Sequence, residues 1–198
     1  FFARAWDTIV RLGGREELRN RTELLSGTRG RVLEVGAGSG LNFRLYPPEV
    51  EQVVAVEPEP TMASRAAERA RRADVPVKMV RATAEALPFR DETFDTVVLC
   101  LVFCSVDDPV RAASQVRRVL RPGGELRVYE HVRSASPRAA RWQDRFERPW
   151  GVVGGGCHPN RDTVATLRAS GFEVDVRRLP VGPPSPARPH VLGTARPA

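Results

Sequence analysis

The sequence predicts an α/β fold of one domain: a doubly wound, mostly parallel seven-stranded sheet whose last strand is antiparallel. Three observations lead to this fold class. Short apolar runs alternate with helix-forming segments, the first of these runs ends in a glycine-rich turn, and the second ends in an acid. The 198 residues, 41% of them hydrophobic, are enough for one core, so no second domain is needed.

Residues 1–30 are expected to form a helical segment ahead of the sheet. Apolar side chains recur among charged ones on both sides of Gly13 and Gly14, a pattern that predicts two helices. In enzymes of this shape such a segment often covers the pocket, and an amphipathic helix packed on the sheet edge is the alternative. Residues 31–198 are expected to form the α/β domain itself.

The first strand and its turn are read from residues 31–40, whose sequence is RVLEVGAGSG. Three glycines let the backbone bend and approach a ligand closely: Gly36, Gly38 and Gly40. A dinucleotide site would have a glycine where Leu41 stands, which disfavours a pyrophosphate ligand. The carboxylate of Glu34 would also repel phosphate but attract an ammonium or sulfonium group, so the ligand should carry positive charge.

The next elements extend this ligand site. Residues 41–46 begin a first crossover helix that Pro47 and Pro48 stop early, and its free N–H groups would suit a carboxylate. The second strand, at residues 52–57, ends in Glu57, about 20 residues beyond the first glycine, where a carboxylate binds a ribose diol. Met62, in the first turn of a second crossover helix at residues 60–72, either lies near an adenine or fills the core.

The rest of the sheet follows in order. Strands are expected at residues 77–81, 94–105 with the strand exit, 125–131, 172–179 and 191–195, the last two as an antiparallel pair joined by a proline-rich connection at 180–189. A helix at 109–120 and a turn at 122–124 precede the fifth strand. Because ligands lie at the carboxyl ends of parallel strands, residues 100–105 should lie beside the reacting centre. Cys100 and Cys104 belong to that centre or are small buried hydrophobes.

Several segments resemble the successive motifs of class I S-adenosylmethionine-dependent methyltransferases: residues 34–40, Glu57, AEALPF at 84–89, FD at 94–95 and LRPGG at 120–124. The resemblance implies a Rossmann-like fold, S-adenosyl-L-methionine as cofactor and S-adenosyl-L-homocysteine as product. Many relatives have an aspartate where Thr83 stands, so adenine recognition would use this hydroxyl, backbone groups or Glu85. The implied cofactor-binding residues are Glu34, Gly36, Ala37, Gly38, Gly40, Asn42, Glu57, Pro58, Met62, Thr83, Ala84, Glu85, Cys100 and Leu101.

The distal part, including LVFCSV at 101–106 and RPH at 188–190, is similar to the mammalian thiol methyltransferases and, less closely, to bacterial phospholipid N-methyltransferases and quinone C-methyltransferases. S-methylation of a small thiol is therefore favoured. The alternatives are N-, C- or O-methylation of a phospholipid head group, quinone or other small acceptor, a nucleic-acid methyltransferase, and a non-catalytic cofactor-binding module. The candidate catalytic residues are Cys104, His131 and His158; a structural hydrogen bond is the alternative role for each histidine.

Composition limits the partners. The net charge of +7 comes almost entirely from scattered arginines, which disfavours nucleic acid and favours a small-molecule acceptor. The three cysteines fit neither a disulfide framework nor structural zinc spacing, so we expect a reducing compartment and no metal. Trivalent arsenic, which some related enzymes bind through three thiolates, is a lesser alternative.

No apolar run approaches the roughly 20 residues that span a bilayer. We therefore expect no transmembrane segment, membrane contact that is at most peripheral, and a cytoplasmic protein.

Overall fold

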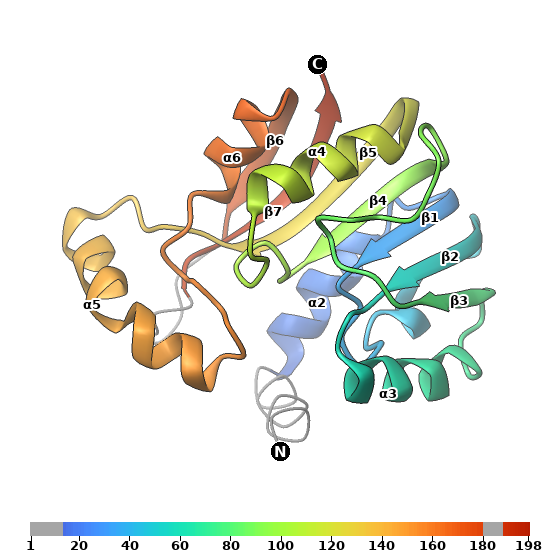
Figure 1. The fold of residues 1–198 in the computed structure, drawn as a ribbon, viewed down its shortest axis with the longest axis horizontal. Coiled ribbons are helices and arrows are strands. Elements are labelled where there is room, and N and C mark those ends of the chain that lie inside the picture. Colours follow the sequence, from blue (N-terminus) through green and yellow to red (C-terminus); the bar gives the residue numbers. More distant parts are fainter. Residues whose placement is uncertain (1–13, 180–187) are drawn as a thin grey trace.

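The strands form one sheet in the order β3-β2-β1-β4-β5-β7-β6, seen in a computed structural model that describes residues 14–179 and 188–198 (Figure 1). Every pairing is parallel except those of β7, which runs antiparallel to β5 and to β6. This confirms the predicted fold class. The strands are β1 Gly30–Val35, β2 Val50–Val56, β3 Val77–Val80, β4 Phe94–Cys100, β5 Leu120–His131, β6 Phe172–Arg178 and β7 His190–Pro197.

Helices cover both faces of this sheet. Residues of α2 (Gly14–Leu25) and α3 (Pro60–Ala70) pack on one face, together with the short 3-10 helix η1 (Phe43–Leu45). Residues of α4 (Pro109–Val119) and α6 (Thr163–Ala169) pack on the other. The long helix α5 (Pro137–Val153) stands apart, beyond the ends of the strands (Figure 1). Among the described residues, none of these helices has the length and apolarity needed to cross a membrane.

The sheet is buried on both faces because successive side chains point to opposite sides and nearly all of them are apolar. In β4, Val97 and Leu99 belong to the core under α4, whereas Val98 and Cys100 belong to the core under α2 and α3. In β1 this alternation turns Glu34, an acid with 1% exposure, toward the α2 side. A buried carboxylate such as Glu34 needs hydrogen-bond donors, and neighbouring side chains supply them.

Three expectations for the elements need correction. The first crossover helix is only the three residues of η1, because the two prolines end it at once. The turn predicted at residues 122–124 is wrong: β5 runs through it, and Gly123, at φ 75°, marks the place where the register with β4 shifts. Helices α5 and α6 were not expected at all.

Two expectations lie wholly or mostly outside the described residues. The first of the two N-terminal helices would fall before Gly14, where the second begins. The proline-rich connection falls mostly on residues 180–187.

Candidate functional site

A pocket of about 420 Å³ opens at the carboxyl ends of β1, β2 and β4. The sharp reversal of strand order between β1 and β4 leaves this space between the crossovers, as is usual in doubly wound sheets. All but one of the predicted cofactor-binding residues line it: Glu34, Gly36, Ala37, Gly38, Asn42, Glu57, Pro58, Met62, Thr83, Ala84, Glu85, Cys100 and Leu101. Residues from four separate parts of the chain thus line one pocket.

The three glycines of the loop after β1 differ in what surrounds them. Gly36 has φ +66°, and a Cβ there would lie 2.7 Å from a methyl carbon of Val102. A Cβ on Gly38 would meet no atom within 4 Å, so this glycine borders open pocket space. Gly40 does not line the pocket, and a Cβ there would lie 2.6 Å from the ring of Phe43. Its role is therefore packing under the loop.

Glu57 fixes this loop to the end of β2. One carboxylate oxygen accepts a hydrogen bond from the amide of Gly38 at 2.8 Å, and the other accepts from the amide of Glu59 at 3.0 Å. Burial raises the pKa of Glu57, while both amide bonds act in the opposite direction. The side chain is only 8% exposed and lies on the pocket wall, where it can accept further hydrogen bonds.

Glu34 is the centre of a buried polar network. Its oxygens accept hydrogen bonds from Asn42 Nδ2 at 2.7 Å and from the Tyr46 hydroxyl at 2.8 Å. Burial raises its pKa to about 7, although these bonds and the charge of Arg21 favour ionisation. Arg21 reaches from α2, donates to Asn42 Oδ1 at 2.8 Å and pairs with Glu17 at 2.8 Å. Arg21 also lines the pocket, and no sequence pattern had pointed to it.

The predicted adenine side is formed by the segment after β3. Thr83, Ala84 and Glu85 all line the pocket. One oxygen of Glu85 accepts a hydrogen bond from the amide of Asp107 at 2.9 Å, so this carboxylate also holds the segment that leads into α4. Asp107 lines the same part of the pocket and was not expected there.

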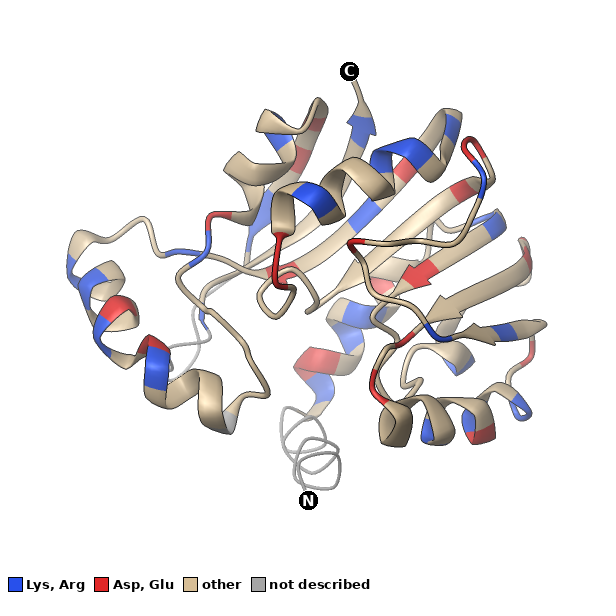
Figure 2. Cartoon of the chain, in the orientation of Figure 1, with Lys and Arg blue, Asp and Glu red and all other residues tan. Residues whose placement is uncertain are grey.

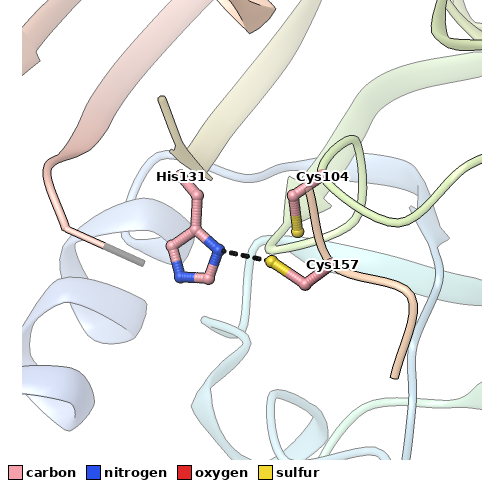
Figure 3. Close-up of side chains that lie close together, drawn as sticks. All are labelled: Cys104, His131 and Cys157. Atoms are coloured by element: carbon pink, nitrogen blue, oxygen red, sulfur yellow. Dashed lines mark hydrogen bonds between the residues drawn. The ribbon is translucent and has the colours of Figure 1, made fainter. Parts of the chain in front are cut away.

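Two cysteine side chains line the opposite end of the pocket. Cys104, in the turn after β4, and Cys157, in the glycine turn after α5, both line it. His131, the last residue of β5, lies behind them, with its Nδ1 3.3 Å from Cys157 Sγ (Figure 3). The contact between the thiols lowers the pKa of Cys157 and raises that of Cys104, so Cys157 ionises first.

The histidines differ in their surroundings. His131 is 5% exposed and lies beside His190, with ring centroids 4.5 Å apart. Burial lowers the pKa of His131, but the contact with Cys104 and the charges of Glu130 and Glu17 together outweigh it, and the net change is upward. His158 does not line the pocket; its Nδ1 lies 2.7 Å from Glu147 of α5. Only His131 is therefore brought together with the cysteines.

The turn that carries Cys104 is held on both sides. Glu130 accepts hydrogen bonds from the amides of Val102 at 2.7 Å and Phe103 at 3.1 Å. Arg161 donates to the carbonyls of Phe103 at 2.7 Å and Val106 at 2.6 Å. Leu101, at the start of this turn, has φ 60°, a strained conformation for leucine of the kind that occurs at functional sites.

Comparison with known proteins gives consistent matches. A methyltransferase-domain family model matches residues 33–128. The human thiol S-methyltransferase TMT1B is 36% identical, over 91% of this chain and 77% of its own. The phosphatidylethanolamine N-methyltransferase of Cereibacter sphaeroides is 41% identical over 63% of each chain. The crystal structure of a putative methyltransferase from Bacillus halodurans has a similar fold, with a TM-score of 0.71 over 83% of this chain and 72% of its own, at 21% identity.

The pocket agrees with the cofactor that these matches imply. Gly38 leaves open the space that a Cβ would fill, Glu57 presents a buried carboxylate at the rim, and Glu34 places a second acid where a cationic ligand would be attracted. The loop lacks the third glycine of a dinucleotide-binding pattern, because Leu41 stands in its place. With the fold, the pocket and the relatives in agreement, the chain belongs to the class I S-adenosylmethionine-dependent methyltransferases and acts on a small molecule.

Proposed function

We propose that this chain transfers a methyl group to the sulfur of a small thiol. The observation that supports this most directly is the sulfur-lined end of the pocket, where Cys104 and Cys157 face the space and His131 lies behind them. Buried, polarisable sulfur side chains make favourable contacts with a polarisable sulfur acceptor. The similarity to thiol S-methyltransferases across 91% of the chain favours the same reaction.

The glycine-loop end would hold the cofactor. We propose that Glu57 accepts hydrogen bonds from the ribose, that the loop at Gly36 and Gly38 admits the ligand closely, and that the charge of Glu34 attracts its amino group. When bound, S-adenosylmethionine supplies an electrophilic methyl group on a sulfonium sulfur. The protein's part is to align the acceptor with that methyl group and to exclude water.

The acceptor end must help a thiol to ionise. A thiol with its ordinary pKa near 8.5 is only a few per cent thiolate at neutral pH. We propose that Cys104 and Cys157 contact the acceptor and that His131, which does not line the pocket, positions Cys157. The predicted catalytic role of His158 has no support from its contacts with Glu147.

The direct test is product analysis by mass spectrometry with methyl-labelled S-adenosylmethionine and a panel of acceptors. The panel contains small thiols, sulfide, phosphatidylethanolamine, quinols and RNA. We expect label on thiol sulfur, and less of it with Glu57→Gln, which tests whether the label depends on this pocket. Label on another acceptor alone would overturn the thiol assignment, and bound cofactor without any product would indicate a non-catalytic module.

RNA is included because of the net charge, but the charge distribution does not favour it. Figure 2 shows basic and acidic residues interspersed along the helices and strands. A nucleic-acid site concentrates positive charge in one groove or face.

A phospholipid head group is the second candidate acceptor, and helix α5 favours it. Trp142 and Phe146 on this helix are 36% and 39% exposed, with ring centroids 5.1 Å apart. Basic residues recur along the same helix, with two acids between them (Figure 2). Exposed aromatic and basic side chains on one helix are typical of contact with a membrane surface. This candidate requires methylated phosphatidylethanolamine in vesicles and loss of that product when Trp142 and Phe146 become serine.

A further inference from the structure

Three donor groups that are far apart in the sequence converge at the acceptor end of the pocket. The Sγ atoms of Cys104 and Cys157 and a ring nitrogen of His131 all lie within 4.8 Å of one another, and all three residues are buried (Figure 3). They come from the turn after β4, the end of β5 and the turn after α5. The spacing of the cysteines alone gave no sign of this, because the fold and not the sequence makes them neighbours.

The donor set has the chemistry of a zinc site. Thiolate and imidazole are the ligands that zinc prefers, and zinc bound at about 2.3 Å from sulfur and about 2.0 Å from nitrogen places tetrahedral donors roughly 3.5–4 Å apart. The separation of His131 Nδ1 from Cys157 Sγ is 3.3 Å and no pair exceeds 4.8 Å, so the donors need to move by only about 1 Å to reach that geometry. All three donors are buried, so water screens their attraction for a cation only weakly.

The number of donors distinguishes a catalytic site from a structural one. Structural zinc is held by four protein ligands, whereas catalytic zinc is held by three and leaves the fourth position for water or substrate. Within residues 14–179 and 188–198, the only cluster of this kind has three members. Since Cys104 and Cys157 both line the pocket, the fourth position would face the bound acceptor.

A buried acid next to the cluster, Glu130, favours the binding of a cation there. Glu130 is 0% exposed, and its Oε2 atom has no hydrogen-bond partner among the described residues. The backbone amide of His158 donates to the carbonyl of Cys104 at 2.6 Å, which fixes the turn of Cys157 against that of Cys104. The other oxygen of Glu130 accepts the amide hydrogen bonds of Val102 and Phe103, and a nearby divalent ion would offset the cost of burying Oε2 without a partner.

We propose that Cys104, His131 and Cys157 bind a zinc ion whose open position takes the sulfur of the methyl acceptor. This deepens the proposed thiol methylation and rests on it for the identity of the acceptor. The acceptor thiol replaces a water on the metal and loses its proton to solvent, because a coordinated thiol is deprotonated. Its sulfur then bonds to the methyl carbon as the carbon–sulfonium bond breaks, with that electron pair returning to the cofactor sulfur. The neutral thioether is a poor ligand and leaves.

Metal binding itself is the first test, and it needs no substrate. Purified full-length protein is loaded with Zn²⁺ or with Co²⁺ as a coloured substitute, desalted, and measured for metal content and for thiolate-to-cobalt charge-transfer absorption. We expect about one metal per chain, tetrahedral cobalt bands, and a higher melting temperature with metal. Cys104→Ser, Cys157→Ser and His131→Gln should each lower the affinity at least 10-fold.

Cys100→Ser is the matched control for metal binding. This third cysteine is also buried and also lines the pocket, but it lies outside the cluster. It should retain one metal with unchanged cobalt spectra. Cofactor binding by each cluster variant shows that it has folded. Equal metal loss in Cys100→Ser, or no metal in the reduced wild-type protein, would overturn the proposal.

Activity then separates this inference from the proposed function. Metal-free protein should bind cofactor normally but methylate a thiol at least 10-fold more slowly, with recovery on adding Zn²⁺. If the chelated protein methylates thiols at full rate, the catalytic zinc is refuted while the thiol reaction stands. If the metal binds with the expected spectra but only another acceptor is methylated, the zinc site stands and the thiol assignment falls.

Discussion

At the scale of single residues, Glu57 gives the sharpest test of the cofactor site. Replacing Glu57 by Gln keeps one oxygen for the amide of Gly38 but removes the charge that would hold a ribose diol. A hydrogen bond to a charged group contributes about 1.5–3 kcal/mol, so we expect the Kd for S-adenosylmethionine to rise about 10- to 100-fold in calorimetric titration. Glu51→Gln, an exposed change on the same strand, is the control. Equal affinities would contradict the role of Glu57.

The sequence was informative about residues whose role depends on a local pattern. Glu34 was found because it precedes the glycine turn within the first strand, Glu57 because it ends the second strand at the expected distance from the first glycine, and both lie on the pocket wall. Gly40 belongs to the same local pattern but packs against Phe43, since spacing does not tell which glycine faces the ligand. Arg21 had no signal, because one arginine on an arginine-rich helix differs from its neighbours only by what the fold places opposite it.

At the scale of elements, the turn after β1 depends on close approach as well as on backbone conformation. An alanine at Gly36 would have to adopt φ +66° and would also press against Val102 at 2.7 Å. Left-handed backbone alone costs roughly 1–2 kcal/mol. We expect Gly36→Ala to lower the unfolding free energy in urea by more than this and to weaken cofactor binding.

Two variants separate strain from contact. Gly123→Ala has a similar φ of 75° but open space around its Cβ, so it should show the backbone cost alone. Adding Val102→Ala to Gly36→Ala should restore part of the loss, seen as a positive coupling in a double-mutant cycle. Identical losses for the two glycine variants would show that contact with Val102 is unimportant.

Helix α2 is expected to be part of the site and not only a cover for the sheet. Arg21 donates a hydrogen bond to Asn42, and Asn42 donates one to Glu34. The change Arg21→Gln should therefore leave the Glu34 side chain less firmly positioned and weaken cofactor binding about 10-fold. Arg19→Gln, an exposed change two residues away, should leave the affinity unchanged. Calorimetric titration of both variants is the measurement. Unchanged affinity in Arg21→Gln would mean that α2 serves the core alone.

The elements themselves were predictable to different degrees. The strands were found because buried parallel strands are continuous apolar runs, as in VVLC at residues 97–100. Helix α5 was missed because its exposed face mixes arginine, tryptophan and a proline inside the helix, Pro149, so that no apolar stripe stands out. The turn predicted around Gly123 was wrong because a glycine pair indicates a chain reversal and a bulge within a strand equally well.

At the scale of the whole molecule, the two ends of the pocket differ in how far the sequence defines them. The cofactor end follows from the order of consecutive strand ends and could be written down in advance. The acceptor end joins Cys104, His131 and Cys157 through the pairing of β4 with β5 and the return of the chain after α5. Such an assembly depends on long-range topology, which local patterns do not contain.

At the scale of the whole molecule, the contribution of Glu34 to the unfolding free energy should fall as the pH rises from about 4.5 to 7. Burial raises its pKa from 4.5 to about 7 in the folded state, so within this window the folded chain holds a proton that the unfolded chain has released. The stabilisation is complete below the unfolded pKa and lost above the folded one. A shift of this size corresponds to at most about 3.5 kcal/mol.

Urea unfolding of the wild type and of Glu34→Gln, at pH values from 4.5 to 8, isolates this effect, because glutamine does not titrate and all other groups are shared. We expect the difference in unfolding free energy to favour the wild type most at the acidic end and to level off above pH 7. Saturating S-adenosylmethionine should flatten the wild-type slope, because a cationic ligand beside Glu34 lowers its pKa in the bound state. Parallel curves without cofactor would show that the pKa of Glu34 is not raised in the folded state. An unchanged slope with cofactor would place the positive charge of the cofactor elsewhere in the pocket.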